Sequence, residues 1–449
     1  MAKKKIEFLA VAKEKEVIDR CQLVTEEFGY SFSHVDNIDK YAELSTEDQE
    51  AYLILLCAIE EKAEASIAGM VQIAKQMSHE SFVMVVVNKR VSPDGAQFIK
   101  KSGASLVIVE HELFNSSKLD YIAAQKIRAS YLPAKSSEFK KDTTINFGLY
   151  HLLPLNKKFL PVAHSGSELT EQRITKINQI GEVYVRREDL KLYEQYLRDH
   201  PDLSAAGLKS RCRAQFLLMQ SGYIDLALML SDQSESASFS YGKTLLDTCT
   251  KYASDLLMTL ATVGEAFDVI NNSSIGEFGT VDRAPAIASY AGLISLMSGV
   301  GKPEEIMLSA MIADLGMLDL SPNISRAIRN ETTSQLPQED LALYQKHPLI
   351  SLNVSLSRRL PIGEGMKDII LNTHEKNDGT GFPNRFRGEK IPHEAQLIQF
   401  CELIDRGSLI KMGKERKSAA QVRKEIFDRE FTEGKYFNIL FLDKIKSVI

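Results

Sequence analysis

Residues 1–133 alternate short apolar runs with longer stretches in which apolar side chains recur every three or four positions. Runs rich in Val, Ile, Leu and Phe are typical of strands that are covered on both faces. The longer stretches have the spacing of amphipathic helices, so this order predicts a parallel sheet with helices on both sides. The apolar runs are Ile6–Ala12, Ala51–Ala58, Phe82–Val87 and Leu106–Val109, and the helical stretches are Lys15–Phe28, Ala63–Met77, Pro93–Lys101 and Leu119–Ser130.

This strand–helix order, with Gly103-Ala104 before the last run, resembles a response-regulator receiver domain. A working receiver has a phosphoacceptor Asp at the end of its third strand, acidic residues after its first strand and a Lys after its fifth. The residues at those places are Cys57 and Ala58, Ala12 and Lys13, and Glu110. Because phosphoryl transfer needs carboxylates that hold magnesium, we predict a pseudo-receiver that serves in docking or dimerisation. A phosphorylation-driven switch is the alternative.

The middle of the chain is predicted to contain a linker, a small α/β module and a helical connector. Residues 134–142 are polar and rich in Lys and Ser, which is typical of a linker. Residues 143–200 form the module, and apolar stripes at helical spacing fill residues 203–270. The module's segments are strands at Phe147–Leu155, Phe159–Val162 and Val183–Val185 and helices at Thr170–Ile180 and Glu188–Arg198. The helical connector suggests a homodimer stalk as a hypothesis.

Length, composition and charge limit the number of domains, the kinds of partner and the location that we expect. The 449 residues favour about three domains at roughly 150 residues each. The formal net charge is −5, and no Lys/Arg block is interleaved with aromatic residues, so we expect no nucleic-acid partner. No apolar segment is long enough for a signal peptide or a membrane span, so a cytoplasmic location is expected. The five scattered cysteines indicate reduced, mostly buried thiols.

Residues 271–449 are predicted to be all-helical and contain four motifs. The most specific is His374-Glu375-x-x-Asp378-Gly379-Thr380-Gly381-Phe382-Pro383, followed by Gly388 and Ile391-Pro392. The other three are Ala310–Gly316, Leu336–Leu349 with its His347-Pro348, and Ala395–Asp405. In this order they resemble the HD-GYP domain, the metal-dependent cyclic-di-GMP phosphodiesterase type, over about 40% of the chain. The predicted architecture is therefore a receiver-like α/β domain, a small α/β module and a C-terminal all-α HD-GYP-like domain.

The resemblance implies a set of metal ligands, of which this chain retains a part. The positions that match are Asp314, His347 and His374, with Glu402 where the family has Asp. Ala313 and Thr373 stand where the family has His. The early helical His is Asp282 or Arg283 here, and no His occurs between His200 and His347. Four ligands suffice for one ion but not for a bridged pair. We therefore expect no cofactor or, failing that, one divalent ion, iron or manganese.

The residues that contact phosphate are also reduced. Met317 replaces the family's Lys after the HD motif, and Gln396 replaces its Arg, so two charge-assisted contacts are lost. We therefore favour a non-catalytic signalling or scaffold protein. Two alternatives are a one-metal phosphodiesterase, in which Asp314 takes part in catalysis, and a metal-free cyclic-nucleotide sensor. The surviving residues also have a purely structural interpretation, with Asp314 as a helix cap and both histidines as polar core residues.

The segment that contains Gly379 and Gly381 has a different implication. In the family this loop contacts diguanylate-cyclase partners, so recognition of such signalling proteins is a hypothesis for this chain. The candidate partner-binding residues are Asp378, Gly379, Gly381, Phe382 and Pro383, with Arg385, Arg387 and Lys390 beside them as a positive edge. The alternative is a loop that is kept because the fold needs its turns.

Overall fold

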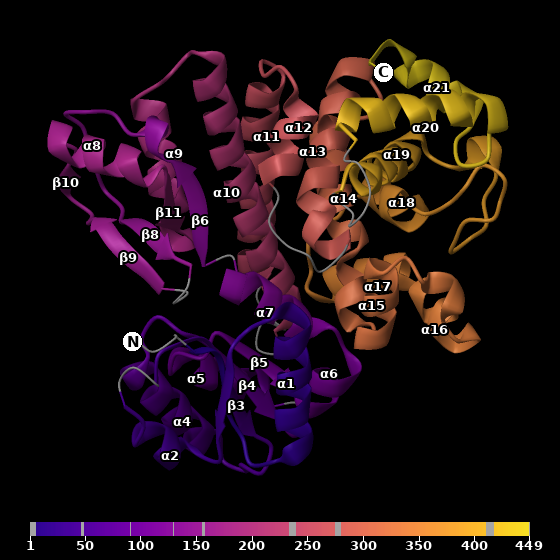
Figure 1. The fold of residues 1–449 in the computed structure, drawn as a ribbon. Helices are drawn as coiled ribbons and strands as arrows, with labels where there is room; N and C mark the ends of the chain where they lie inside the picture. Colours follow the sequence, from indigo (N-terminus) through magenta and orange to yellow (C-terminus); the bar gives the residue numbers. More distant parts are fainter. Residues whose placement is uncertain are drawn as a thin grey trace. The chain divides into compact units, whose positions relative to one another are not determined.

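The computed structural model describes residues 6–45, 49–89, 91–128, 130–154, 158–232, 239–273, 280–409 and 417–448. The chain divides into two compact units. One comprises residues 1–200 and 228–238, and the other comprises residues 201–227 and 239–449. Figure 1 shows the N-terminal part as two α/β modules and the C-terminal part as helices. This agrees with the multidomain layout that the sequence predicts.

The first module contains a five-stranded parallel sheet in the order β2-β1-β3-β4-β5. Apolar side chains of the central strands alternate between two cores, one on each face, which the flanking helices cover. The predicted parallel sheet is therefore confirmed. The strands are β1 (Ile6–Val11), β2 (Phe32–Val35), β3 (Ala51–Ala58), β4 (Phe82–Val87) and β5 (Leu106–Val109), and the helices are α1 (Lys15–Phe28), α2 (Ile38–Ala42), α4 (Glu64–Met77), α5 (Pro93–Lys101), α6 (Glu110–Asn115) and α7 (Lys118–Arg128).

Strand β2 is absent from the predicted apolar runs. It lies at the edge of the sheet, and its four residues are half-buried or exposed, so it lacks a continuous apolar sequence. Cys57 lies at the end of β3, where a receiver would have its phosphoacceptor. Its thiol is half-buried, and burial raises its pKa to about 12, so it stays protonated.

The second module is a four-stranded antiparallel sheet in the order β6-β11-β8-β9. The predicted linker at residues 134–142 is wrong at its start, because Ala134 and Lys135 belong to β6 and pair with β11. Strand β6 is short and contains Pro133, so its sequence carries little strand signal. The elements are β6 (Tyr131–Lys135), β7 (Thr144–Ile145), β8 (Leu149–Leu153), β9 (Lys158–Ala163), β10 (Ser167–Glu168), β11 (Glu182–Arg186), α8 (Glu171–Ile180) and α9 (Leu190–Asp199).

The described residues from 205 onward form helices and short 3₁₀ turns. No helix among them, or elsewhere in the described ranges, has the length and apolarity needed to cross a membrane. The helices are α10 (Ala205–Ser231), α11 (Phe239–Leu260), α12 (Ala266–Ser273), α13 (Thr280–Ser298), α14 (Pro303–Ala313), α15 (Pro322–Arg329), α16 (Gln338–Tyr344), α17 (His347–Ser357), α18 (Glu364–Asn372), α19 (His393–Ser408), α20 (Ala419–Glu433) and α21 (Ile439–Ile445), and the 3₁₀ helices include η4 (Leu315–Asp319). Helices α13, α14, α18 and α19 pack on one another and form the centre of this part.

Candidate metal centre

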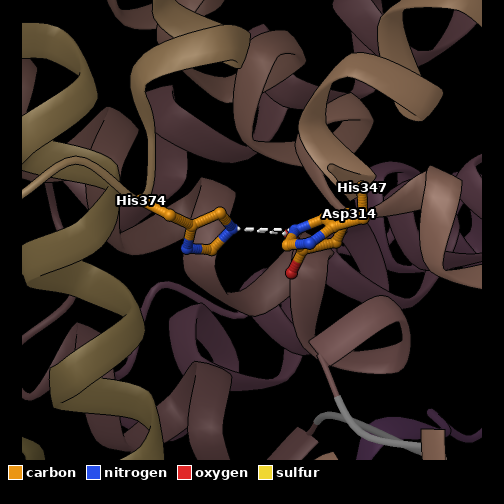
Figure 2. Close-up of side chains that lie close together, drawn as sticks. All are labelled: Asp314, His347 and His374. Carbon is orange, nitrogen blue, oxygen red and sulfur yellow. Dashed lines mark hydrogen bonds and ion pairs between the residues drawn. The ribbon is translucent and has the colours of Figure 1, made fainter. Parts of the chain in front are cut away.

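Three polar side chains that lie far apart in the sequence meet inside the helical part. Asp314 Oδ1 lies 3.2 Å from His347 Nε2 and 3.2 Å from His374 Nε2, and the two Nε2 atoms are 3.0 Å apart. Figure 2 shows the imidazole of His374 facing that of His347, with Asp314 beside them. All three side chains are buried. We call Asp314, His347 and His374 the donor cluster.

Helix ends bring the cluster together. Asp314 follows α14, His347 begins α17, and His374 follows α18. The Ser351 hydroxyl donates to the Ala313 carbonyl (2.6 Å) and accepts from the Gly316 N–H (2.7 Å), which ties the end of α14 to α17. A Cβ atom at Gly316 would lie 2.5 Å from the His347 carbonyl oxygen, so only glycine permits this approach.

The second nitrogen of each imidazole faces a hydrogen-bond acceptor. His347 Nδ1 lies 2.6 Å from the Tyr344 carbonyl oxygen, which can only accept, so Nδ1 carries the proton. His374 Nδ1 lies 3.6 Å from Glu402 Oε2. Such partners fix the tautomer of metal-binding histidines and leave the Nε2 lone pairs free for a ligand bond. Both Nε2 atoms are thus directed at Asp314 and at each other.

This geometry fits one bound cation. Two Nε2 atoms and a carboxylate oxygen at 3.0–3.2 Å are held together either by protons shared in hydrogen bonds or by a metal ion among them. A triangle with these sides has a circumradius of about 1.8 Å, so one point lies about 2.1 Å, a usual metal–ligand distance, from all three atoms. Two imidazoles and one carboxylate on one side of an ion leave its other positions open.

Hydrogen bonds and charges around the donor cluster shift the pKa values of Asp314 and His374. Burial alone would raise the pKa of Asp314, but hydrogen bonds from His347 and His374 hold that pKa well below its ordinary value. Burial alone would lower the pKa of His374, but the hydrogen bond to Asp314 and the charge of Glu402 outweigh it and raise that pKa. An ionised carboxylate beside basic imidazoles is a favourable environment for a cation.

The fourth predicted ligand, Glu402, lies outside the donor cluster. Its Oε2 atom faces Nδ1 of His374, and its Oε1 atom accepts a hydrogen bond from Arg406. Neither oxygen of Glu402 belongs to the group of ligand atoms that lie within 4.8 Å of one another. Glu402 therefore supports His374 in this structure, because its carboxylate faces Nδ1 of the ring.

At the positions where the HD-GYP family has further histidines, the residues of this chain make other contacts. Ala313 is buried in the last turn of α14, and the Thr373 hydroxyl donates to the Ile369 carbonyl (2.9 Å) of its own helix. Arg283 on α13 donates from Nε to Asp405 (2.9 Å) and from Nη2 to Asn271 (3.0 Å). Within the described residues, the donor cluster is the one group of three or more ligating side chains with metal-binding spacing.

The two residues that replace the family's basic phosphate contacts are apolar or already hydrogen-bonded. Met317 is a buried thioether side chain in η4. The Gln396 amide donates to the Ile391 carbonyl (3.0 Å) and accepts from the Asn438 N–H (3.0 Å). Gln396 therefore joins two chain segments and has no guanidinium to offer a phosphate.

Two aromatic rings beside the cluster were not identified from the sequence. Tyr344 stacks on the His347 ring with centroids 5.2 Å apart, and Phe382 stacks on the His374 ring at 5.0 Å. Phe382 also meets Tyr344 and His347 edge-on. Tyr344 is the last residue of α16 and His347 is the first of α17, so no helical spacing predicts their contact. The sequence predicts Phe382 only as a candidate partner contact.

The loop at residues 378–387 packs against the backbone that carries His374. Asp378 accepts hydrogen bonds from the Thr380 N–H (2.9 Å) and hydroxyl (2.7 Å). Gly379 has a positive φ of 75°, and a Cβ atom at Gly381 would lie 2.3 Å from the Lys376 nitrogen, so both positions require glycine. The ring of Phe382 faces the donor cluster, and the peptide bond before Pro383 is cis.

Comparison with known protein families matches residues 268–421 to the HD domain. The curated relatives include a 3'3'-cGAMP-specific phosphodiesterase of Vibrio cholerae, 22% identical over 34% of this chain and 28% of its own length. They also include the cyclic di-GMP phosphodiesterase response regulator RpfG of Xanthomonas campestris, 25% identical over 40% of this chain and 46% of its own length. A solved HDG"Y"P protein from Bdellovibrio bacteriovorus is 16% identical, with a TM-score of 0.45, over 71% of this chain and 99% of that chain.

The chain matches less than half the length of either curated relative. The family match begins in α12 and ends in α20, and it contains the donor cluster and the loop at residues 378–387. The helical architecture, the four ordered motifs and this match agree with one another. Residues 268–421 of this chain form an HD domain.

Proposed function

We propose that this chain is a cyclic-dinucleotide signalling protein whose HD domain binds at most one metal ion and acts by contacting other proteins rather than by hydrolysing cyclic-di-GMP. The observation that carries the proposal is the size of the donor cluster. Three side chains converge, and Glu402 lies beside Nδ1 of His374, outside the group of converging ligand atoms. Hydrolysis by a bridging hydroxide needs two ions held side by side, and three monodentate donors do not hold two.

The residues at the two positions where the family has basic phosphate contacts support the same proposal. A phosphodiester has a negative charge that active sites balance with Arg, Lys or a second metal ion. Buried Met317 and the amide of Gln396, which bonds the Ile391 carbonyl and the Asn438 N–H, offer neither. The guanidinium of Arg406, on the same helix as Gln396, is already paired with Glu402.

A partner-binding role rests on the loop at residues 378–387, which we call the docking loop. Its outer side chains Arg385 and Arg387 are exposed, as is Lys390 after it. The chain as a whole has a formal charge of −5, so this basic edge contrasts with the rest of the molecule. Basic edges favour acidic protein surfaces through charge complementarity, and a diguanylate cyclase or another signalling protein with such a surface is the partner that we propose.

An assay of cyclic-di-GMP turnover tests the proposal. The full chain is incubated with cyclic-di-GMP and saturating Mn²⁺ or, without oxygen, Fe²⁺, and linear and mononucleotide products are separated by chromatography. We expect no product above the level of a His374→Ala variant. Turnover that His374→Ala abolishes, and that the exposed control His164→Ala retains, would overturn the proposal.

A second candidate is a one-metal phosphodiesterase, which the compactness of the donor cluster favours. One ion at this position would have open coordination sites for water and a phosphate oxygen. Asp314, His347 and His374 would hold the ion, while the carboxylate of Glu402 would face the N–H at Nδ1 of His374. Hydrolysis of bis(p-nitrophenyl) phosphate with one equivalent of Mn²⁺ per chain, lost in His347→Ala, would support this candidate.

A further inference from the structure

The docking loop is attached to the donor cluster by direct contacts of its backbone. The Phe382 N–H donates to the His374 carbonyl (3.2 Å), and the residue after His374, Glu375, has a completely buried carboxylate. That carboxylate accepts hydrogen bonds from the Asn384 N–H (2.5 Å) and the Phe386 N–H (3.0 Å). One segment, His374-Glu375, therefore carries a member of the donor cluster and also holds the backbone of the loop.

Ring packing strengthens the attachment. The Phe382 ring lies face to face with the His374 imidazole, with 23° between the planes, and edge-on to the His347 imidazole. These contacts exist only while both imidazoles keep their present orientations. The close approach at Gly381, where a Cβ atom would lie 2.5 Å from the Glu375 Cα, leaves no space for the loop to shift inward. A rotation of His374 must therefore disturb the loop.

A cation in the donor cluster would fix the orientation of His374. The Nε2 atoms of both imidazoles and Oδ1 of Asp314 lie within 3.2 Å of one another, and each Nδ1 faces an oxygen acceptor. Without a metal ion, hydrogen bonds through the Nε2 atoms connect the imidazoles to Asp314. A metal ion bonded to both Nε2 atoms and to Oδ1 would replace these hydrogen bonds and restrict the His374 ring, which lies against the loop.

We infer that a cation in the donor cluster orders the docking loop, so that the loop presents its basic edge to a partner when the metal is bound and loses that shape when it is removed. This inference deepens the proposed function, because it assigns regulation to the same loop. In this role, a metal centre with three protein ligands would act without catalysing a reaction. The cation acts through His374 and Phe382 on the loop backbone.

Hydrogen–deuterium exchange on the full chain tests the inference. The backbone amides of Phe382, Asn384 and Phe386 are followed with Mn²⁺ bound and after chelation, and mass spectrometry verifies metal loss. We expect these amides to exchange at least about tenfold faster after chelation. Amides in β3 of the first unit, which lies outside the HD domain, should exchange at an unchanged rate and provide the internal control.

Two variants separate the loop from the metal. Phe382→Leu removes the ring that lies on His374 but no donor atom, so we expect Mn²⁺ to remain bound while the loop amides exchange faster. Phe159→Leu, a half-buried stacked ring in the first unit, is the matched control and should change neither property. The inference is overturned if the loop amides exchange at the same rate in the metal-bound chain and in the chain that is verified to be metal-free. It is also overturned if chelation speeds the exchange of every amide in the second unit to the same extent. Neither readout depends on cyclic-di-GMP, so hydrolysis of that compound would refute the proposed function and leave this inference standing.

Discussion

At the scale of single residues, Glu402 shows how a side chain that is not a ligand can determine metal affinity. Its Oε2 atom lies 3.6 Å from Nδ1 of His374, and Arg406 holds the other oxygen. A carboxylate in this place keeps the imidazole proton on Nδ1 and increases the basicity of Nε2. A metal ion bound at Nε2 of His374 would therefore depend on a residue outside the group of its ligands.

Replacing Glu402 with Gln should weaken Mn²⁺ binding by about 10- to 100-fold, because the amide cannot supply the negative charge. Isothermal titration or competition with a metal indicator measures the change. Glu425→Gln on α20, an exposed glutamate that pairs with Lys417, is the matched control and should bind as the unaltered chain does. An unchanged affinity in Glu402→Gln would show that Glu402 does not act on His374.

The raised pKa of His374 predicts a pH dependence of metal binding. A metal needs the unprotonated Nε2, and the pKa of His374 lies above its ordinary value of 6.5, so protons compete with the metal even above pH 6.5. Asp314 stays ionised, because its pKa is lowered. Mn²⁺ affinity should therefore fall steadily as the pH is lowered from about 8 to about 6. Equal affinities across that range would contradict the raised pKa of His374.

At the scale of helices and strands, the approach of η4 to α17 sets the distance between Asp314 and His347. Gly316→Ala would place a Cβ atom 2.5 Å from the His347 carbonyl oxygen and 2.6 Å from the Ser351 nitrogen, both in the backbone. The two segments must separate, so we expect a loss of about 1–3 kcal/mol in unfolding free energy and much weaker Mn²⁺ binding. Chemical denaturation and metal titration measure these effects.

Gly365→Ala provides the control for this change. Gly365 lies in α18, and no atom lies within 4 Å of the position that a Cβ would take there. The substitution should leave stability unchanged or raise it by up to about 1 kcal/mol, because alanine favours helix. If Gly316→Ala behaved like Gly365→Ala, the tight contact would not be what holds the cluster together.

The sequence predicts those helices and strands whose own residues show a clear pattern of apolar side chains. Strands β1, β3, β4 and β5 have continuous apolar runs, whereas the edge strand β2 and the short β6 do not. Asp314, His347 and His374 were identifiable because the family motifs include them. Tyr344 and Phe382 stack on the two imidazoles, and Glu402 lies beside Nδ1 of His374. These contacts depend on tertiary packing, which no local sequence pattern encodes.

At the scale of the whole molecule, the first module is a five-stranded parallel sheet with helices on both faces, and its interpretation as a pseudo-receiver remains a prediction. Cys57 at the end of β3 carries a half-buried thiol whose pKa is raised to about 12. Among the described residues, no cluster of metal ligands lies at that edge of the sheet. Incubation with acetyl phosphate and Mg²⁺ should therefore leave the intact mass unchanged. A stable acyl-phosphate on residues 1–133 would refute the pseudo-receiver prediction.

The central claim concerns the number of metal ions that the HD domain can hold. The chain is purified without chelators, supplied with excess Mn²⁺ or Fe²⁺ and freed of unbound metal, and the bound ions are counted by native mass spectrometry. The geometry of Asp314, His347 and His374 predicts one ion per chain, which is lost in His347→Ala and in His374→Ala. Two ions per chain, both lost in these variants, would contradict the account.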